Sequence, residues 1–156
     1  MDSMTELADE AMRRLDTSKY RELTAEHSSV PVLCHQDYGK GNALLTDEGV
    51  MVIDLDNVTL DLPSRDLRKI IGKISQDNNR WDKKTIENIL LWYSNVSAVS
   101  EDERTVLYID LLFPHWFFGV VKNQYGKLKD IKASDIERIA ALERSKAPVL
   151  RELLER

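Results

Sequence analysis

The amino-acid sequence predicts a mainly α-helical domain with one small β-hairpin region, which is an α+β architecture. Apolar residues recur at helical spacing up to residue 23 and again through most of the chain after residue 63. Between these segments lie short apolar runs separated by polar, glycine-containing stretches, the pattern of strands and turns. With 156 residues, the chain has the size of one domain and can bury about 70% of its unfolded surface.

The first segment predicts an amphipathic helix from Met4 to Leu23. Asp2 or Ser3 precedes this helix, and either side chain can cap its first turn. Residues 24–29 are polar and are expected to link the helix to the first strand. The apolar residues expected on one helix face are Leu7, Ala8, Ala11, Met12 and Leu15.

The β region is predicted from three apolar runs, Val32–Cys34, Ala43–Leu45 and Val50–Ile53. Residues 35–42 form a loop between the first two runs, and its glycines at positions 39 and 41 let the backbone turn back on itself. Residues 46–49, Thr-Asp-Glu-Gly, have the composition of a tight turn. The second and third runs are therefore expected to form a hairpin.

Polar side chains are concentrated where these strands end. Asp54 and Asp56 follow the third run, and Asp37 and Asn42 lie in the loop after the first. Because a hairpin of this length folds back, the carboxylates after Ile53 are expected beside Asp37 and Asn42. Three acidic groups at one spot repel each other unless a cation lies among them. Oxygen ligands of this kind suit Mg²⁺, which takes one or two carboxylates and completes its shell with water and phosphate.

Two helices are predicted directly after the β region. Pro63 suits the first position of the first helix, and residues 76–79, Gln-Asp-Asn-Asn, end it. Asp82 is expected to open the second helix. Their apolar positions are Leu67, Ile70, Ile71 and Ile74, and then Ile86, Ile89, Leu90 and Tyr93.

A third helix is predicted from Ser100 to Leu112, because Ser100 and Glu103 have the spacing of a capping box. Pro114 interrupts the helical pattern, and residues 115–125 are expected to form a further, buried helix. The aromatic residues and one histidine are expected to pack in the core rather than bind a ligand. These residues are Trp81, Trp92, His115, Trp116, Phe117 and Phe118.

The last helix is predicted to start at residues 134–137, which repeat the capping-box spacing. Pro148 is expected to kink or restart this helix. Its apolar positions are Ile136, Ile139, Ala140, Leu142, Leu150, Leu153 and Leu154.

The composition argues against several classes of protein. The net charge is −5 and no stretch gathers Lys and Arg among aromatic residues, so a nucleic-acid surface is not expected. The single cysteine, Cys34, excludes an internal disulfide and is typical of a reducing compartment. Residues 1–10 lack the apolar core of a signal peptide, and no apolar run approaches about 20 residues. We therefore expect a cytoplasmic protein that binds neither nucleic acid nor a membrane.

Two motifs in the β region resemble those of a known enzyme group. Residues 35–42, HQDYGKGN, resemble the catalytic loop H-x-D-x-x-x-x-N of the aminoglycoside phosphotransferase and choline kinase group, whose fold is protein-kinase-like. Residues 53–56, IDLD, are similar to the second metal motif of that group, and residues 61–67, DLPSRDL, also fit. The combination resembles in particular the spore coat CotS-type members. The similarity is dense over residues 32–71 and looser beyond, where residues 113–125 also fit.

This resemblance implies a phosphotransferase that moves a phosphoryl group from ATP to a hydroxyl group of a small molecule. Another nucleoside triphosphate in place of ATP is left open. Asp37 is implied to be the base or orienting carboxylate for the acceptor hydroxyl. Asn42 and Asp54 are implied to hold Mg²⁺ beneath the nucleotide phosphates, and Asp56 to reach the metal through water at most. Phosphoryl transfer needs such an arrangement because it depends on positioning and on neutralising charge.

Other residues of these motifs have supporting roles in the same interpretation. His35 is expected to support the loop structurally. Asp66 is expected to accept backbone hydrogen bonds from the loop, although a helix-surface aspartate is an equally good interpretation. Lys40 can contact phosphate or be solvated only, and Gln36 and Tyr38 can line the acceptor side.

The resemblance covers only the C-terminal lobe of such a kinase. A kinase of this group has an N-terminal lobe with a strand lysine, its glutamate partner and a nucleotide-covering loop, whereas the residues before His35 contain no glycine. We expect residues 1–156 to be a single kinase-like lobe, with its motifs at 32–71 and a helical subdomain at 63–156. Catalysis would then need the missing lobe in cis or in trans, and the isolated chain is expected to be weak or inactive.

Two alternatives remain open at this stage. Residues 50–61 also resemble the first motif of haloacid dehalogenase-type phosphatases, in which Asp54 would be the nucleophile and Asp56 the general acid/base. The helical pattern that follows disagrees with the alternating strands and helices of that fold. The second alternative is a non-enzymatic, kinase-like module that assembles with spore coat proteins.

Overall fold

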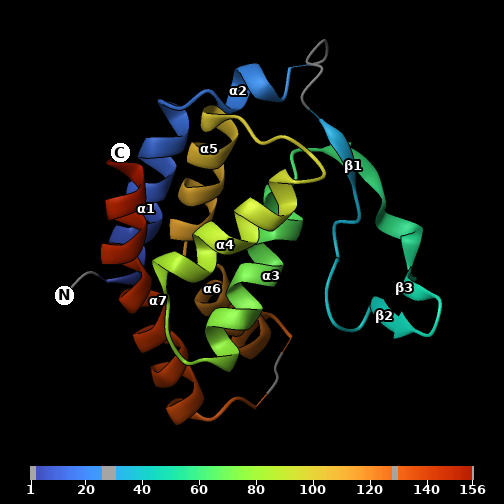
Figure 1. Ribbon diagram of the computed structural model, residues 1–156. Helices are drawn as coiled ribbons and strands as arrows, with labels where there is room; N and C mark the ends of the chain where they lie inside the picture. Colours follow the sequence, from blue (N-terminus) through green and yellow to red (C-terminus); the bar gives the residue numbers. More distant parts are fainter. Residues whose placement is uncertain (1–2, 26–30, 128–129, 156) are drawn as a thin grey trace.

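A bundle of helices carries a small β region on one side (Figure 1). The computed structural model describes residues 3–25, 31–127 and 130–155. The helices are α1 (Met4–Asp16), α2 (Tyr20–Leu23), α3 (Ser64–Asp77), α4 (Lys83–Ser94), α5 (Glu101–Leu112), α6 (His115–Val121) and α7 (Ala133–Leu154). The strands are β1 (Val32–Cys34), β2 (Ala43–Thr46), β3 (Gly49–Val52) and β4 (Thr59–Asp61). A 3₁₀ turn covers Leu55–Asn57 and a π turn covers Lys122–Gly126.

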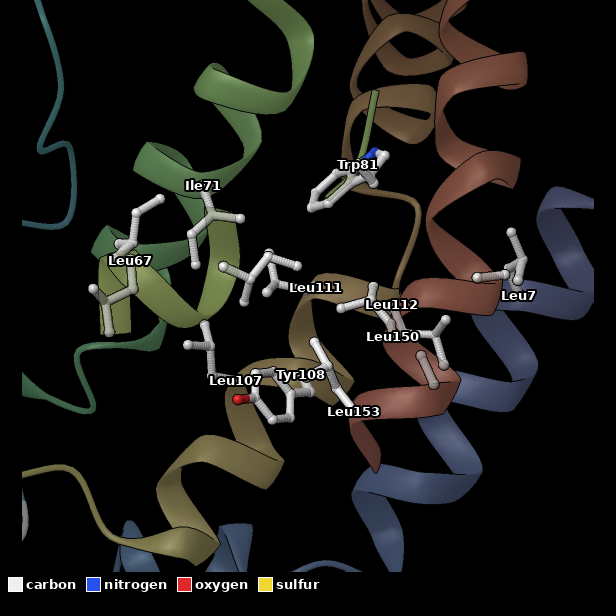
Figure 2. Packing of buried hydrophobic residues seen from close by; sticks show 14 of the residues in the cluster. Leu7, Leu67, Ile71, Trp81, Leu107, Tyr108, Leu111, Leu112, Leu150 and Leu153 are labelled. Atoms are coloured by element: carbon white, nitrogen blue, oxygen red, sulfur yellow. The ribbon is translucent and has the colours of Figure 1, made fainter. Parts of the chain in front are cut away.

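The core of the bundle is built around α5, which contacts α1, α3 and α7. Leu107, Leu111 and Leu112 of this helix are at most 1% exposed, and they face different neighbours (Figure 2). A helix that is apolar on more than one side is stable only when other helices surround it. Leu7 of α1, Ile71 of α3 and Leu150 of α7, each 0% exposed, supply those surroundings.

The predicted helix over residues 4–23 is instead two helices, α1 and α2. Ser3 caps α1 in a capping box with Glu6, as expected for one of the two candidate caps. The break follows Asp16, where the hydroxyls of Thr17 and Ser18 donate hydrogen bonds to the last carbonyls of α1. Such side-chain bonds compete with helix continuation. Most of the predicted linker, from residue 26 on, lies outside the described residues.

The predicted hairpin is confirmed, with Ala43 paired to Val52 and Thr46 paired to Gly49. Gly49 has φ 127°, a conformation that side chains disfavour. The first strand does not join this hairpin. It pairs antiparallel with β4, a strand that the sequence analysis did not predict.

Both sheets in the described part of the chain are antiparallel pairs of strands. A haloacid dehalogenase-type phosphatase requires a parallel sheet with alternating helices. That alternative for Asp54 and Asp56 is therefore wrong.

The helices predicted after the β region are confirmed with small shifts. Pro63 precedes α3 rather than occupying its first position, and the Asp82 side chain caps α4 by accepting the Thr85 amide at 2.9 Å. Ser100 and Glu103 form the expected capping box of α5. The predicted apolar positions of these helices are buried or pack against the core.

The segment after Pro114 differs from the prediction. It forms the short helix α6 and then a π turn, and neither contains a fully buried residue. Phe118 is 39% exposed, and Trp92 on α4 is 65% exposed, so core packing was wrong for both. Trp81 is buried as expected.

The last helix also differs from the prediction. It starts at Ala133 with no side-chain cap and continues through Pro148 without a restart. Proline removes one helical hydrogen bond. Here Ala147 and Leu150, which flank it, are buried in the core, and this packing keeps the two parts in one helix. None of the described helices is long and apolar enough to cross a membrane.

Candidate functional site

The loop over residues 35–42 is anchored at its first residue. His35 is 7% exposed, and its Nε2 lies 2.8 Å from the carbonyl oxygen of Ile53 at the end of the hairpin. The amide of Asp37 donates to Nδ1 of the same ring at 3.3 Å. Both ring nitrogens of His35 are thus engaged, one with the hairpin and one with the loop. His35 therefore ties the loop to the hairpin and is not placed as a proton acceptor.

Asp66, in the first turn of α3, holds the loop from the other side. One carboxylate oxygen accepts the His35 amide at 2.7 Å, and the other accepts the Tyr38 amide at 3.3 Å. Hydrogen bonds from amides to a carboxylate are stronger than neutral ones. This is the contact that the motif resemblance implied for Asp66, rather than the position of a free surface aspartate.

Gln36 is turned into the fold. Its φ is 67°, in the left-handed region, and its side-chain amide donates to Asp61 at 3.0 Å. The residue is 6% exposed. Gln36 consequently connects the loop to β4 and does not line an acceptor surface.

The next residue, Asp37, is exposed and has two partners. The side chain of Asn42 donates to the Asp37 carbonyl at 3.0 Å and lies 3.4 Å from its carboxylate. Lys69 of α3 forms an ion pair with the same carboxylate. Partial burial lowers the pKa of Lys69 from its usual value. The ammonium group thus lies directly beside the oxygen that would face an acceptor hydroxyl.

The hairpin brings Asp54 next to the loop. The Ile53 amide donates a hydrogen bond to the Asn42 carbonyl at 3.0 Å, and Asp54 is the next residue along the chain. Asp54 itself has φ 61° and ψ 59°. This left-handed conformation is costly for a non-glycine residue and is concentrated at functional sites. Asp56 lies in the exposed 3₁₀ turn that follows.

The described residues contain no group of three His, Cys, Asp or Glu side chains that could hold a metal ion. Asp37, Asp54 and Asp56 thus do not form such a group in this structure, and metal binding by Asn42, Asp54 and Asp56 stays a prediction. Like charges repel, and Asp37 pairs with Lys69, a cation that the prediction left out. Asn42 and Asp54 still offer an amide oxygen and a carboxylate on two segments that the hydrogen bond from Ile53 to Asn42 joins. Such a set fits Mg²⁺, which takes one or two carboxylates and obtains its other ligands from water and phosphates.

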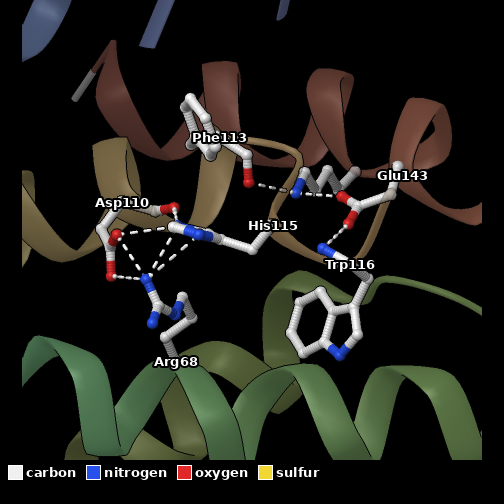
Figure 3. A network of polar contacts seen from close by, with 7 residues as sticks. Arg68, Asp110, Phe113, His115, Trp116 and Glu143 are labelled. Atoms are coloured by element: carbon white, nitrogen blue, oxygen red, sulfur yellow. Dashed lines mark hydrogen bonds and ion pairs between the residues drawn. The ribbon is translucent and has the colours of Figure 1, made fainter. Parts of the chain in front are cut away.

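A cavity of about 520 Å³ lies beside the loop. Residues 37–42 form one wall, and cationic residues of α3 together with His115 and Trp116 form the other. Arg68 in this wall is fixed by contacts of 2.8 Å to Asp110 and 2.8 Å to His115 (Figure 3). Sequence reasoning assigned no role to these cations, although Arg65, Lys69 and Lys73 recur every four residues along one helix face.

The position of Trp116 is set by a buried ion pair. Glu143 and Lys146 of α7 pair with each other at 2% and 0% exposure. Glu143 accepts the Trp116 amide at 2.8 Å, and Lys146 donates to the Phe113 carbonyl at 2.9 Å (Figure 3). Burial lowers the pKa of Lys146. This pair holds both ends of the turn that carries His115 to the cavity.

A second cavity of about 390 Å³ lies on the hairpin side of the loop and is mostly apolar. Its lining includes Leu33, Val52, Leu55, Ile70 and Tyr93. A mostly apolar cavity with a few polar groups is the usual form of a small-molecule site.

The chain was compared with known proteins. Residues 5–149 match the protein family described as "Spore coat putative kinase YutH". The chain is 31% identical to spore coat protein S of Bacillus subtilis (strain 168) over an alignment of 159 positions. The alignment covers 99% of the chain and 45% of that protein. It superposes with a TM-score of 0.78 and 18% identity on a crystal structure of aminoglycoside phosphotransferase from Alicyclobacillus acidocaldarius subsp. acidocaldarius. That match covers 97% of the chain and 47% of the solved one. The chain has a kinase-like fold and spans about half the length of these relatives.

Proposed function

The chain belongs to the YutH family of kinase-like spore coat proteins, and on this basis we propose that it is the C-terminal lobe of an ATP- and Mg²⁺-dependent small-molecule phosphotransferase. The observation that carries the proposal is the arrangement of Asp37, Asn42 and Asp54. The loop places the Asp37 carboxylate next to the Asn42 amide, and Asp54 directly follows Ile53, whose backbone amide donates to the Asn42 carbonyl.

In the proposed reaction, the acceptor hydroxyl oxygen bonds to the γ-phosphorus of ATP, and the bond from phosphorus to the ADP oxygen breaks. Asp37 orients the hydroxyl and accepts its proton. Asn42 and Asp54 hold Mg²⁺, which supplies neutralisation of the phosphate charge, and Asp56 contacts it through water at most. His35 and Asp66 keep the loop in place by the hydrogen bonds described above. Most of the catalytic effect in such transfers comes from positioning and charge.

We also propose that a second lobe, in cis or in trans, covers the β region. The exposed surface of the strands is unusually apolar: Leu33 is 74% exposed, Leu45 87% and Leu60 69%. Leu33 and Leu60 are paired across β1 and β4, and exposed apolar side chains gathered in this way are typical of a surface that another protein part covers. The apolar cavity beside β1 would then form part of an adenine pocket that the second lobe completes.

Nucleotide binding and turnover test these two proposals separately. MgADP should raise the melting temperature of the chain, and Asp54→Asn should remove this effect. Asp47→Asn, in the exposed hairpin turn, is the control and should behave as wild type. ADP release from MgATP by the chain alone should be slow and should disappear in Asp37→Asn. A melting temperature that MgADP does not change would contradict the site, and fast turnover by the chain alone would contradict the need for a second lobe.

A non-enzymatic role in spore coat assembly is the second candidate. It is favoured by the matching family and relative, both of which carry a spore coat name. In that case the exposed strands would contact coat proteins. Incorporation into the coat that is unaffected by Asp37→Asn and Asp54→Asn, and lost in Leu45→Lys, would favour assembly over phosphate transfer.

A further inference from the structure

The cavity beside the loop is strongly cationic, although the whole chain carries a net charge of −5. Among the residues that the structure describes, five basic ones line it, and Asp37 is the only acidic one. The basic residues are Lys40, Arg65, Arg68, Lys69 and Lys73. A hollow lined by charge of one sign concentrates ligands of the opposite sign.

Some of this charge is already paired within the protein. Lys69 pairs with Asp37, and Lys73 lies 2.8 Å from Asp77. Lys40 and Arg65 form no ion pair with any described residue and are exposed. Both therefore remain available to a ligand.

Arg68 retains donors for a ligand even though it is paired. Its contacts with Asp110 and His115 in the described structure are all made through Nη1 (Figure 3). A guanidinium group carries five N–H donors over three nitrogens. The contacts to Asp110 and His115 thus hold Arg68 in place while Nε and Nη2 can still bind an anion.

The cavity lies on the helical side of the loop. No residue between Asn42 and Arg65 in the sequence lines it, so neither Asp54 nor the hairpin contributes to it. Of the residues proposed to hold Mg²⁺, Asn42 lines this cavity, whereas Asp54 and Asp56 do not. Asp37 and Asn42 are the residues that this cavity shares with the proposed reaction.

We propose that the phosphate acceptor is a small hydroxyl compound that also carries an anionic group, a phosphate or a carboxylate. Arg65 and Lys40 bind the anionic group, with Arg68 beside them, while the hydroxyl lies at Asp37. This inference rests on the proposed function, because it names the substrate class of the same site. Guanidinium groups suit both anions, since their paired N–H donors match two oxygens at once.

Matched sugars test the inference by binding alone, without turnover. Glucose 6-phosphate, glucuronate and glucose would be titrated into the ¹⁵N-labelled chain, and amide shifts of residues 37–42 followed by NMR. Glucose 6-phosphate or glucuronate should bind at these residues at least tenfold more tightly than glucose. The comparison of the two anions identifies which group the cavity prefers.

Arg65→Gln removes one exposed charge and should weaken binding of the anionic sugar by about two- to fivefold, the upper part of the range for one exposed ion pair. Arg13→Gln, on the exposed face of α1, is the matched control and should have no effect. If Arg65→Gln proves unstable, Lys40→Gln in the loop serves the same purpose.

Equal affinity for charged and uncharged sugars, or equal effects of Arg65→Gln and Arg13→Gln, would overturn the inference. Displacement of the bound anion by MgADP would also overturn it, because the cavity would then be a nucleotide phosphate site. Failure of the proposed function has a different signature. In that case anion binding persists, whereas ADP release does not depend on Asp37.

Discussion

The indole ring of Trp116 lies so close to the backbone of Gly72 that no side chain fits at residue 72. A Cβ atom placed there would be 1.6 Å from Cη2 of the ring. Trp116 also packs against Trp81 with ring centroids 6.2 Å apart. This contact between α3 and α6 sets the distance between the cationic face of α3 and His115, and so the width of the cationic cavity.

Gly72→Ala should destabilise the protein by about 1–3 kcal/mol or more, because the added methyl group forces the indole ring to move. Gly119→Ala is the matched control, since a Cβ at residue 119 meets no atom within 4 Å. Alanine favours a helix over glycine by about 1 kcal/mol, so the control should not lose stability. Urea unfolding of both variants measures the difference, and equal stabilities would contradict the packing described.

Removing one member of the buried pair Glu143–Lys146 should cost about 3–5 kcal/mol, because the remaining charge is left buried without a partner. The double variant Glu143→Leu with Lys146→Met should lose less than the sum of the single changes. Denaturant unfolding of all four proteins gives the coupling. For the exposed pair of Lys73 and Asp77, the same cycle should give a coupling of about 0–1 kcal/mol. Similar couplings for both pairs would be inconsistent with the burial of Lys146.

Asp66→Ala should loosen the loop over residues 35–42. The variant loses the two hydrogen bonds to the amides of His35 and Tyr38. A hydrogen bond to a charged group contributes about 1.5–3 kcal/mol, so hydrogen exchange at these amides should speed up by about tenfold or more. Asp77→Ala, at the other end of α3, should leave both amides unchanged. Unchanged exchange in Asp66→Ala would show that the loop is held by other contacts.

The thiol of Cys34 should react slowly in the folded protein. Burial raises its pKa from 9.0 to about 11, so only about one thousandth is thiolate at pH 8. The reaction rate with a disulfide reagent should rise about tenfold per pH unit from pH 7.5 to 9.5, whereas in urea it should level off near pH 9. Because the folded pKa is raised, the contribution of the neutral thiol to stability is complete below pH 9 and falls towards pH 11. A rate for the folded protein that levels off near pH 9 would contradict this.

Local sequence signals predicted the structure correctly where the stabilising contacts lie within one short segment. The caps at Ser100 and Asp82 and the hairpin around Gly49 are of this kind, since their hydrogen bonds join residues a few positions apart. The motif resemblance pointed to Asp66, whose contacts reach across 31 and 28 residues and leave no local pattern.

Features that depend on tertiary packing were missed. The strand β4 exists because it pairs with β1, and Pro148 remains in a helix because its neighbours are buried. The ion pair of Lys69 with Asp37 joins two elements, so the sequence indicated the carboxylate but not its cationic partner. Trp92 is a large aromatic residue of the kind that usually packs in a core, but here it lies exposed on α4.

Paramagnetic broadening by Mn²⁺, a substitute for Mg²⁺, tests the proposed metal site most directly. Mn²⁺ with ADP would be titrated into the ¹⁵N-labelled chain and into Asp54→Asn and Asp47→Asn. We predict broadening centred on residues 37–42 and 53–56 in the wild type and in Asp47→Asn, and its loss in Asp54→Asn. Broadening that is centred elsewhere, or that persists in Asp54→Asn, would contradict a kinase-like metal site in this protein.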